Sequence, residues 1–295
     1  MKKIDNILSI KNLNVEYPLF GGILQREVSA VHAVKNVSLE IPKGKTFGIV
    51  GESGSGKSTL GKAIINVLKL TAPDVRVNGN IIFNDDANNK TDILSLNRNE
   101  ILKYRSKIQM IFQDPFSSLN PRMIVKDIIQ EPLDLHTSLS REEKNQKVGW
   151  LLEKVGLNKE QGTRYPHEFS GGQRQRIGIA RALATEPEII IADEPVSALD
   201  VSIQAQVINL MMDLQEEFNL TIIFIAHDLS VVKHISSHVA VMYLGEIVEF
   251  NEVNEIFNNP NHDYTKALLT SIPQPNPEGR DKRKEERLKV KKYNM

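Results

Sequence analysis

The sequence contains no cysteine. A chain without cysteine forms no disulfide, no thiolate metal site and no cysteine-ligated iron–sulfur cluster, and it cannot use a cysteine nucleophile. It also lacks an excess of either charge, because 37 Lys and Arg balance 37 Asp and Glu. General nucleic-acid binding needs a basic surface for phosphate contacts, so we expect no nucleic-acid partner.

Long apolar runs are missing as well. A stretch such as 222–226 is far shorter than the ~20 apolar residues that a membrane-spanning helix needs. The N-terminus starts with lysines but reaches Asp5 and Asn6 before any long apolar stretch, so it predicts no signal peptide. We therefore expect a soluble cytoplasmic chain that acts at a membrane only through a partner.

The apolar residues that are present suffice for a large core. They make up 40% of the 295 positions, a length that suits one large α/β domain or a core domain with an inserted subdomain. Residues 7–17 and 34–41 alternate apolar and polar side chains on either side of a loop with Gly21 and Gly22. This pattern predicts antiparallel strands at the N-terminus.

From residue 46 onward, short apolar runs alternate with helical patterns. Expected strands cover 46–50, 188–192, 220–226 and 239–244, and expected helices cover 57 to about 68, 172–184, 201–218 and 229–235. Such alternation predicts a largely parallel sheet covered by helices. Residues 114–184 are helical in character and interrupted by prolines, so we expect an α-helical subdomain inserted into this sheet.

The last residues, 273–295, are first rich in proline and then charged. Between 277 and 295, eight Lys and Arg accompany four Asp and Glu. This composition predicts a flexible, solvated end. A weak electrostatic contact with an anionic bilayer or RNA stays open as the alternative.

Residues 51–58 (GESGSGKS) match the phosphate-loop pattern GxxxxGK[ST] at every specified position, between an expected strand and an expected helix. Glycine lets the backbone curl so that successive N–H groups point at phosphate oxygens, where a Cβ would obstruct them. The following helix adds its positive N-terminal dipole. Lys57 supplies a cation for the β- and γ-phosphates, and the Ser58 hydroxyl can ligate Mg²⁺. The expected nucleotide-binding residues of this loop are Gly51, Glu52, Ser53, Gly54, Ser55, Gly56, Lys57, Ser58 and Thr59.

A second signal is the run 188–194 (EIIIADE), which predicts a strand buried on both faces. It delivers Asp193 and Glu194 at its carboxyl end, where ligands bind in open α/β sheets. We expect Asp193 to hold Mg²⁺ through water and Glu194 to polarise the water that attacks the γ-phosphate. The alternative is an ordinary apolar strand that ends in two acidic residues where it leaves the core.

Ser170, Gly171, Gly172 and Gln173 precede another expected helix. A serine and two glycines at a helix start form a second anion-binding cap. Since the chain already has a complete phosphate loop, the economical explanation is that this cap serves a nucleotide bound to another subunit. A plain cap for its own helix is the alternative.

The order of these motifs resembles that of the ATP-binding cassette (ABC) ATPases over nearly the whole chain, and 169–173 looks like their signature motif. The resemblance implies an α/β P-loop NTPase core with a largely parallel sheet, an N-terminal antiparallel β-subdomain and an inserted helical subdomain, with ATP and Mg²⁺ as ligands. Gln113 looks like the Q-loop glutamine, which joins the Mg²⁺ shell. Asp200 closes a segment similar to the D-loop at the dimer seam. His227 resembles the switch histidine, which acts with Glu194 in catalysis and contacts the γ-phosphate.

Tyr17 is the candidate for the aromatic ring that stacks on adenine. It precedes Gly51 by 34 residues, more than is usual in the family, because 18–32 looks like an extra hairpin. A plain strand tyrosine is the alternative.

A narrower resemblance is to the oligopeptide/dipeptide importer ATPases, and within them to the "F" member of a two-ATPase pair. It is carried by the runs 31–34, 113–122, 226–232 and 260–273. It implies an ABC ATPase domain over 1–272, with a helical subdomain at about 114–184 and a family-specific C-terminal segment at about 251–272.

The resemblance also implies partners and a place of action. These are a second ABC ATPase subunit, two transmembrane permease subunits contacted through 114–122, and indirectly an extracytoplasmic peptide-binding protein. The chain is then a peripheral protein at the cytoplasmic face of a bacterial membrane, where ATP hydrolysis powers uptake of oligopeptides or dipeptides. A heterodimer with a paralogue is favoured, and a homodimer stays open.

Other functions remain compatible with the residues. A soluble ABC ATPase could work on DNA, ribosomes or cluster assembly, although the coiled coils, paired cassettes or zinc cysteines of such proteins are not seen here. A nucleotide-binding regulatory subunit would not hydrolyse ATP, but intact Glu194 and His227 argue against that function. An importer for nickel or glutathione would have the same ATPase, since cargo is chosen by other subunits.

Overall fold

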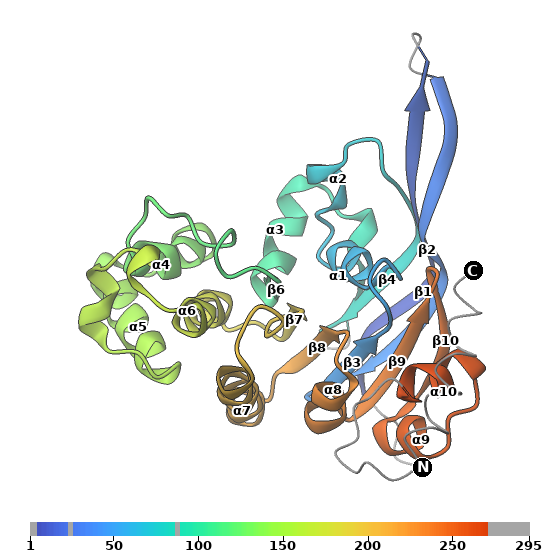
Figure 1. Cartoon of the computed structure of the whole chain (residues 1–295). Coiled ribbons are helices and arrows are strands. Elements are labelled where there is room, and N and C mark those ends of the chain that lie inside the picture. The colour runs from blue at the N-terminus through green and yellow to red at the C-terminus, as the bar shows by residue number, and fades with distance from the viewer. Residues whose placement is uncertain (1–4, 23–25, 86–88, 271–295) are drawn as a thin grey trace.

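The structure is a computed structural model, and it describes residues 5–22, 26–85 and 89–270. The tail predicted over 273–295 lies outside the described residues, as do positions 271 and 272 of the predicted C-terminal segment. Figure 1 shows two sheets, with a group of helices beside the larger one.

The smaller sheet is antiparallel and has the strand order β2-β1-β4-β5. Its strands are β1 (Asn6–Gly21), β2 (Arg26–Pro42), β4 (Arg76–Asn84) and β5 (Lys90–Asp92). β1 and β2 continue pairing out to Gly21 and Arg26, so the extra hairpin predicted at 18–32 is the end of this pair. In Figure 1 it projects away from the body of the molecule.

The larger sheet has the order β10-β9-β3-β8-β7-β6 and is parallel except for β10, which runs antiparallel to β9. The predicted antiparallel N-terminal strands and largely parallel sheet are therefore confirmed. The strands are β3 (Thr46–Val50), β6 (Ile108–Ile111), β7 (Ile189–Asp193), β8 (Thr221–Ala226), β9 (His238–Tyr243) and β10 (Glu246–Glu252).

Ten α-helices occur in the described part of the chain. They are α1 (Lys57–Ile64), α2 (Leu68–Thr71), α3 (Arg98–Lys107), α4 (Val125–His136), α5 (Arg141–Lys154), α6 (Gly171–Leu183), α7 (Val201–Glu217), α8 (Leu229–Ile235), α9 (Val253–Asn258) and α10 (Asp263–Thr270). Short 3₁₀ turns are η1 (Ile93–Ser95), η2 (Lys159–Thr163) and η3 (Pro166–Glu168). No helix in residues 5–22, 26–85 and 89–270 is long and apolar enough to cross a bilayer.

Helix α1 links the two sheets through one apolar core. Leu60 and Ile64 are fully buried together with Ile10 from β1 and Ile49 from β3. Apolar burial of this kind is the main favourable term in folding, so α1 fixes the position of the antiparallel sheet against the parallel one. The loop before α1 is thereby held between them.

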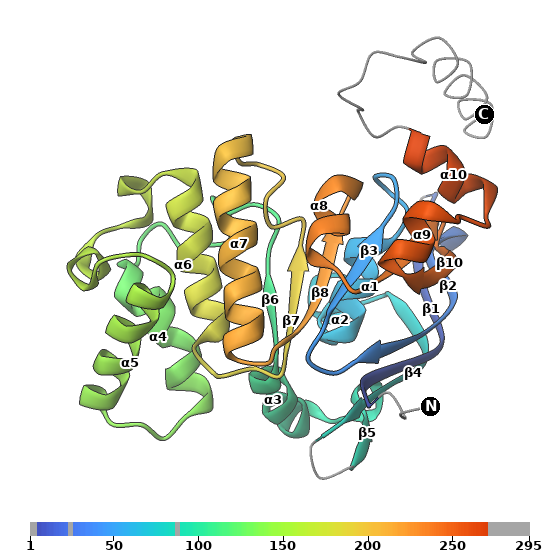
Figure 2. The ribbon, with the colours of Figure 1, turned by 90° about the horizontal axis from the view of Figure 1, so that it is seen from below.

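A second core lies on the other face of the parallel sheet. It joins Leu133 of α4, Leu151 of α5 and Ile177 of α6 with Ile222 and Phe224 of β8. Helices α4, α5 and α6 lie together on the side away from the antiparallel sheet (Figures 1 and 2).

Two local predictions were wrong or incomplete. The helix expected from 57 to about 68 ends at Ile64, because Asn66 takes a left-handed conformation with φ 51° before a separate short helix, α2. The strands and helix between 76 and 111 were not predicted. β6 has only four residues and follows α3 without a break, so neither periodicity nor a turn residue marks it.

Candidate nucleotide-binding site

Four neighbouring parallel strands, β3, β8, β7 and β6, end at one edge of the larger sheet. β3 leads into Gly51, β8 into His227 and β7 into Glu194, while Gln113 lies two residues after β6. Ligands of open α/β sheets bind at the carboxyl ends of strands. The sheet order therefore assembles residues that lie far apart in the sequence.

Two glycines of the phosphate loop are required by the surrounding backbone. Gly51 has φ +155° and Gly56 has φ +105°, a conformation that favours glycine. A Cβ on Gly51 would lie 2.1 Å from the carbonyl oxygen of Met242, and one on Gly56 would lie 2.1 Å from that of Ala33. Close packing of other segments, and not only access for phosphate, thus demands glycine at these positions.

Lys57 is buried within the loop. Its Nζ donates to the carbonyl oxygens of Gly51 at 2.8 Å and Glu52 at 2.7 Å. Burial lowers the pKa of Lys57, while the nearby carboxylates of Glu194 and Asp193 act in the opposite direction. A bound phosphate would offer this ammonium charged oxygens in place of neutral carbonyls.

Ser58 and Asp193 form the part of the site that fits Mg²⁺. The Ser58 hydroxyl donates to Asp193 Oδ1 at 2.8 Å, so two oxygen ligands lie next to each other. Burial raises the pKa of Asp193 because the charged carboxylate is poorly solvated there. A bound cation would compensate for this missing solvation. Mg²⁺ commonly binds through one or two protein oxygens together with phosphates and water, and these residues match that chemistry.

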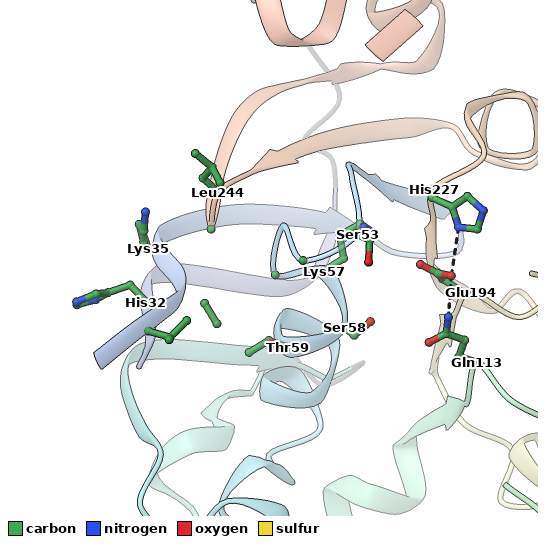
Figure 3. A pocket seen from close by; sticks show the side chains of 15 residues that line it. His32, Lys35, Ser53, Lys57, Ser58, Thr59, Gln113, Glu194, His227 and Leu244 are labelled. Carbon is green, nitrogen blue, oxygen red and sulfur yellow. Dashed lines mark hydrogen bonds and ion pairs between the residues drawn. The ribbon is translucent and has the colours of Figure 1, made fainter. Parts of the chain in front are cut away.

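Glu194 is the point where the remaining predicted side chains meet. Its Oε2 accepts a hydrogen bond from Gln113 Nε2 at 2.9 Å and lies 3.2 Å from His227 Nδ1, as Figure 3 shows. Its backbone has φ 45°, and its N–H donates to the Ile225 carbonyl at 2.9 Å. A non-glycine residue in this region is uncommon, and surrounding contacts must hold it there.

A cavity of about 670 Å³ opens between the loop and these side chains. The predicted residues that line it are Ser53, Gly54, Gly56, Lys57, Ser58, Thr59, Gln113, Glu194 and His227. Val31, His32, Ala33, Lys35, Leu244 and Gly245 also line it and were not predicted. In Figure 3, His32 and Lys35 lie at the end of the cavity opposite Glu194 and His227.

Tyr17 is not among the described residues that line this cavity. It pairs in register with Val31, which does line it, and side chains directly opposite each other on antiparallel strands share a face. Gly51, Glu52, Ser55 and Asp193 are likewise not among the described residues that line the cavity. Gly51, Ser55 and Asp193 are buried, whereas Glu52 is exposed. The run 31–34 contains Val31, His32 and Ala33, and it could have indicated that these residues line the site. In the sequence, however, it supported only the family resemblance.

The signature residues and Asp200 form a separate cluster. Ser170 Oγ accepts from the Gln173 N–H at 3.3 Å, and Gln173 Oε1 accepts from the Ser170 N–H at 3.0 Å, which is a complete capping box on α6. Gly172 packs against Ile203 of α7, whose N-cap is Asp200. Among the described residues lining the cavity, none belongs to this cluster.

Comparison with known proteins gives the family. The model of the ABC transporter family matches residues 34–197, and that of the oligopeptide/dipeptide transporter C-terminal region matches residues 248–294. The oligopeptide transport ATP-binding protein AppF of Bacillus subtilis (strain 168) is 53% identical over 97% of this chain and 84% of its own length. The dipeptide transport ATP-binding protein DppF of Lactococcus lactis is 50% identical over 94% of this chain and 84% of its own length.

Solved structures agree with these matches. A dimeric structure of the ATP-binding cassette MJ0796, bound to ADP and Pi, has a TM-score of 0.68 and 30% identity over 83% of this chain and 98% of that one. CbiO1 from Clostridium perfringens, part of an ABC transporter complex, has a TM-score of 0.70 and 27% identity over 90% of this chain and 95% of its own chain.

The fold and the phosphate loop thus define an ATPase of the ABC cassette type. The chain belongs to the ATP-binding subunits of ABC transporters, in the oligopeptide/dipeptide transporter group. The predicted family and activity, ATP hydrolysis by a transporter subunit, are confirmed. A soluble ABC ATPase without a transporter is disfavoured by the C-terminal match, which is specific to transporters.

Proposed function

We propose that this chain powers the uptake of oligopeptides or dipeptides by hydrolysing ATP at the site formed by residues 51–59. The observation that carries the proposal is the convergence of Gln113 and His227 on Glu194 beside a complete phosphate loop. A non-hydrolysing regulatory subunit would not need this arrangement. ATP phosphates are bound by the loop N–H groups and by Lys57.

Ser58, Asp193 and Gln113 would hold Mg²⁺, which when bound neutralises negative charge on the phosphates. Glu194 is placed to accept a proton from the attacking water. Gln113 and His227 orient that carboxylate through Oε2, and His227 can donate to the γ-phosphate once it turns from Glu194. Tyr17 stays the candidate for stacking on adenine.

A dimer completes the site in this proposal. Ser170, Gly171, Gly172 and Gln173 of one subunit, with Asp200, would close over the nucleotide of the other. The separation of this cluster from the cavity of its own chain supports the idea, as does the dimeric structure of a cassette that is 30% identical. A paralogous second subunit is favoured over a second copy.

The proposed partners are two transmembrane permease subunits and, indirectly, an extracytoplasmic peptide-binding protein. The chain would lie at the cytoplasmic face of the membrane as a peripheral subunit. Phe116, in the segment 114–122, is 59% exposed while Arg174 of α6 lies 4.0 Å from its ring centre. Contact with a permease there would therefore reach the helix that carries the signature residues.

We propose the domain limits 1–272, with a helical subdomain at about 114–184 and a C-terminal segment at about 251–272. The match to 34–197 lies within the proposed ABC ATPase domain, and the match that begins at 248 supports a distinct C-terminal segment. The second match extends to residue 294 and so includes most of the tail predicted at 273–295.

Peptides are the favoured cargo, and glutathione is the second candidate. The glutathione import protein GsiA of Escherichia coli (strain K12) is 50% identical, but this chain spans only 42% of its length. The relatives named for oligopeptide or dipeptide transport are matched over most of their length.

The test is transport-coupled hydrolysis in proteoliposomes that contain the chain, its co-encoded subunits and a binding protein. ATP hydrolysis should rise with dipeptides or oligopeptides, and Lys57→Ala should abolish both ATP binding and this rise. Lys69→Ala, a charge removal in α2 away from the cavity lining, should behave as the wild type. Stimulation by glutathione alone, or unchanged ATP binding in Lys57→Ala, would contradict the proposal.

A further inference from the structure

A hydrogen bond joins the C-terminal helix to the phosphate loop. The Glu52 N–H donates to Tyr264 Oη at 3.1 Å, although the two residues are 212 positions apart. Tyr264 belongs to α10 and lies inside the region matched by the oligopeptide/dipeptide C-terminal model. Since the contact has no local origin in the sequence, it exists only because α10 docks against the site.

Packing fixes the position of the Tyr264 hydroxyl. The residue is 6% exposed, and its ring centre lies 4.1 Å from that of Tyr243 at the end of β9. The loop before it is anchored to β10, where the Glu249 carboxylate accepts from the N–H groups of Asn261 at 2.8 Å and His262 at 3.0 Å. The Tyr264 N–H donates to His262 Nδ1 at 3.1 Å.

The peptide unit that Tyr264 holds also contacts Lys57. A peptide bond is planar, so the Glu52 N–H and the Gly51 carbonyl move as one rigid group. Gly51 O accepts from Lys57 Nζ at 2.8 Å. A hydrogen bond on one side of this plane therefore restrains the acceptor of the lysine on the other side.

The hydroxyl stays neutral under physiological conditions. Burial raises the pKa of Tyr264 to about 12. A neutral hydroxyl can accept from Glu52 without adding negative charge beside a site for triphosphate. The hydrogen bond between Glu52 and Tyr264 can therefore support the phosphate loop without repelling a bound phosphate.

We propose that Tyr264 is a positioning residue of the ATP site: through the Gly51–Glu52 peptide plane, the C-terminal helix sets the geometry of the phosphate loop and of Lys57, and so the affinity for ATP. The inference rests on the proposed role of residues 51–59. It gives the C-terminal region of this group a physical connection to the nucleotide.

The test compares Tyr264→Phe, which keeps the ring, with Tyr104→Phe. Tyr104 Oη donates to Thr91 at 2.7 Å in a part of the molecule that does not line the cavity, so Tyr104→Phe removes a similar hydrogen bond elsewhere. Tyr264→Phe should raise the Kd and KM for Mg·ATP about two- to tenfold, the range of one net hydrogen bond. The kcat of the assembled transporter at saturating ATP should not change.

Amide hydrogen exchange gives a readout that does not depend on nucleotide. The Glu52 amide should exchange slowly in the wild type, faster in Tyr264→Phe and unchanged in Tyr104→Phe. Rapid exchange in the wild type would overturn the inference even if Tyr264→Phe did not fold. Equal ATP affinity in the wild type and Tyr264→Phe, or an equal loss in Tyr104→Phe, would overturn it too, whereas a wild type that does not bind ATP would instead contradict the proposed function.

Discussion

At Glu194, a strained backbone and two side-chain contacts meet in one residue. Glu194→Gln keeps the shape of the side chain but removes the carboxylate that accepts a proton from water. We expect ATP binding to persist while kcat falls about 10²- to 10⁴-fold, as for the loss of a general base. Phosphate release under steady-state conditions measures this.

Glu188→Gln is the matched control for Glu194→Gln. Glu188 immediately precedes β7, at the end of the strand opposite Glu194, and it pairs with Lys107 at 2.9 Å. Its amide variant should keep the wild-type kcat. Wild-type hydrolysis by Glu194→Gln would refute the role of that carboxylate.

Asp193 shows how function costs stability. Burial raises its pKa above the ordinary 3.8, so at neutral pH the folded protein holds a poorly solvated charge. Asp193→Asn should raise the melting temperature of the nucleotide-free protein at pH 7 by a few degrees, since about 1 kcal/mol corresponds to roughly 2–4 °C at this size.

The pH dependence of that gain follows from the sign of the shift. A carboxyl with a raised pKa destabilises the folded state only where it is ionised, so the gain should shrink as the pH falls towards 3.8. Differential scanning fluorimetry across this range measures it. Mg·ATP should stabilise Asp193→Asn less than it stabilises the wild type, because the variant keeps the phosphate loop and Lys57 but loses a charged ligand for Mg²⁺. An equal gain in both would count against Asp193 as a ligand.

At the scale of elements, α5 and α6 allow a paired experiment. Both begin with a serine in a complete capping box, Ser140 with Glu143 and Ser170 with Gln173. Ser140→Ala and Ser170→Ala should each lower the free energy of unfolding by about 1 kcal/mol. Urea unfolding followed by circular dichroism measures this loss.

Only Ser170→Ala should also reduce the ATPase rate of the assembled transporter, because only that cap is proposed to reach a nucleotide. A rate that falls equally in both variants would show that the two caps act through stability alone. A rate that falls in neither would remove Ser170 from the composite site.

For the whole molecule, the prediction concerns assembly. Saturating Mg·ATP should make Glu194→Gln associate with its paralogous subunit, because each nucleotide bridges a phosphate loop and a signature cap and so favours the closed state. Small-angle scattering should then report a particle whose mass is the sum of the two subunits. Particles of single mass under these conditions would contradict a nucleotide-bridged dimer.

The local motifs were predictable because their chemistry is contiguous. Strand β3, the phosphate loop and α1 lie within residues 46–64, and β7 runs directly into Asp193 and Glu194. Gln113 and His227 gained their roles only from the family resemblance, since no local pattern distinguishes them from surface residues. Strand β6 was not predicted because four residues are too few to show a periodic pattern of apolar side chains.

The sequence alone determined the class of fold, the family and the position of the phosphate loop, because hydrophobic periodicity and short motifs are written in neighbouring residues. Tertiary structure decided which distant groups touch. The sheet order brings Gln113 and His227 to Glu194, backbone crossings at Met242 and Ala33 demand two of the loop glycines, and α10 docking puts Tyr264 on Glu52. These contacts join residues separated by long stretches of chain, and only packing of the whole molecule fixes such distances.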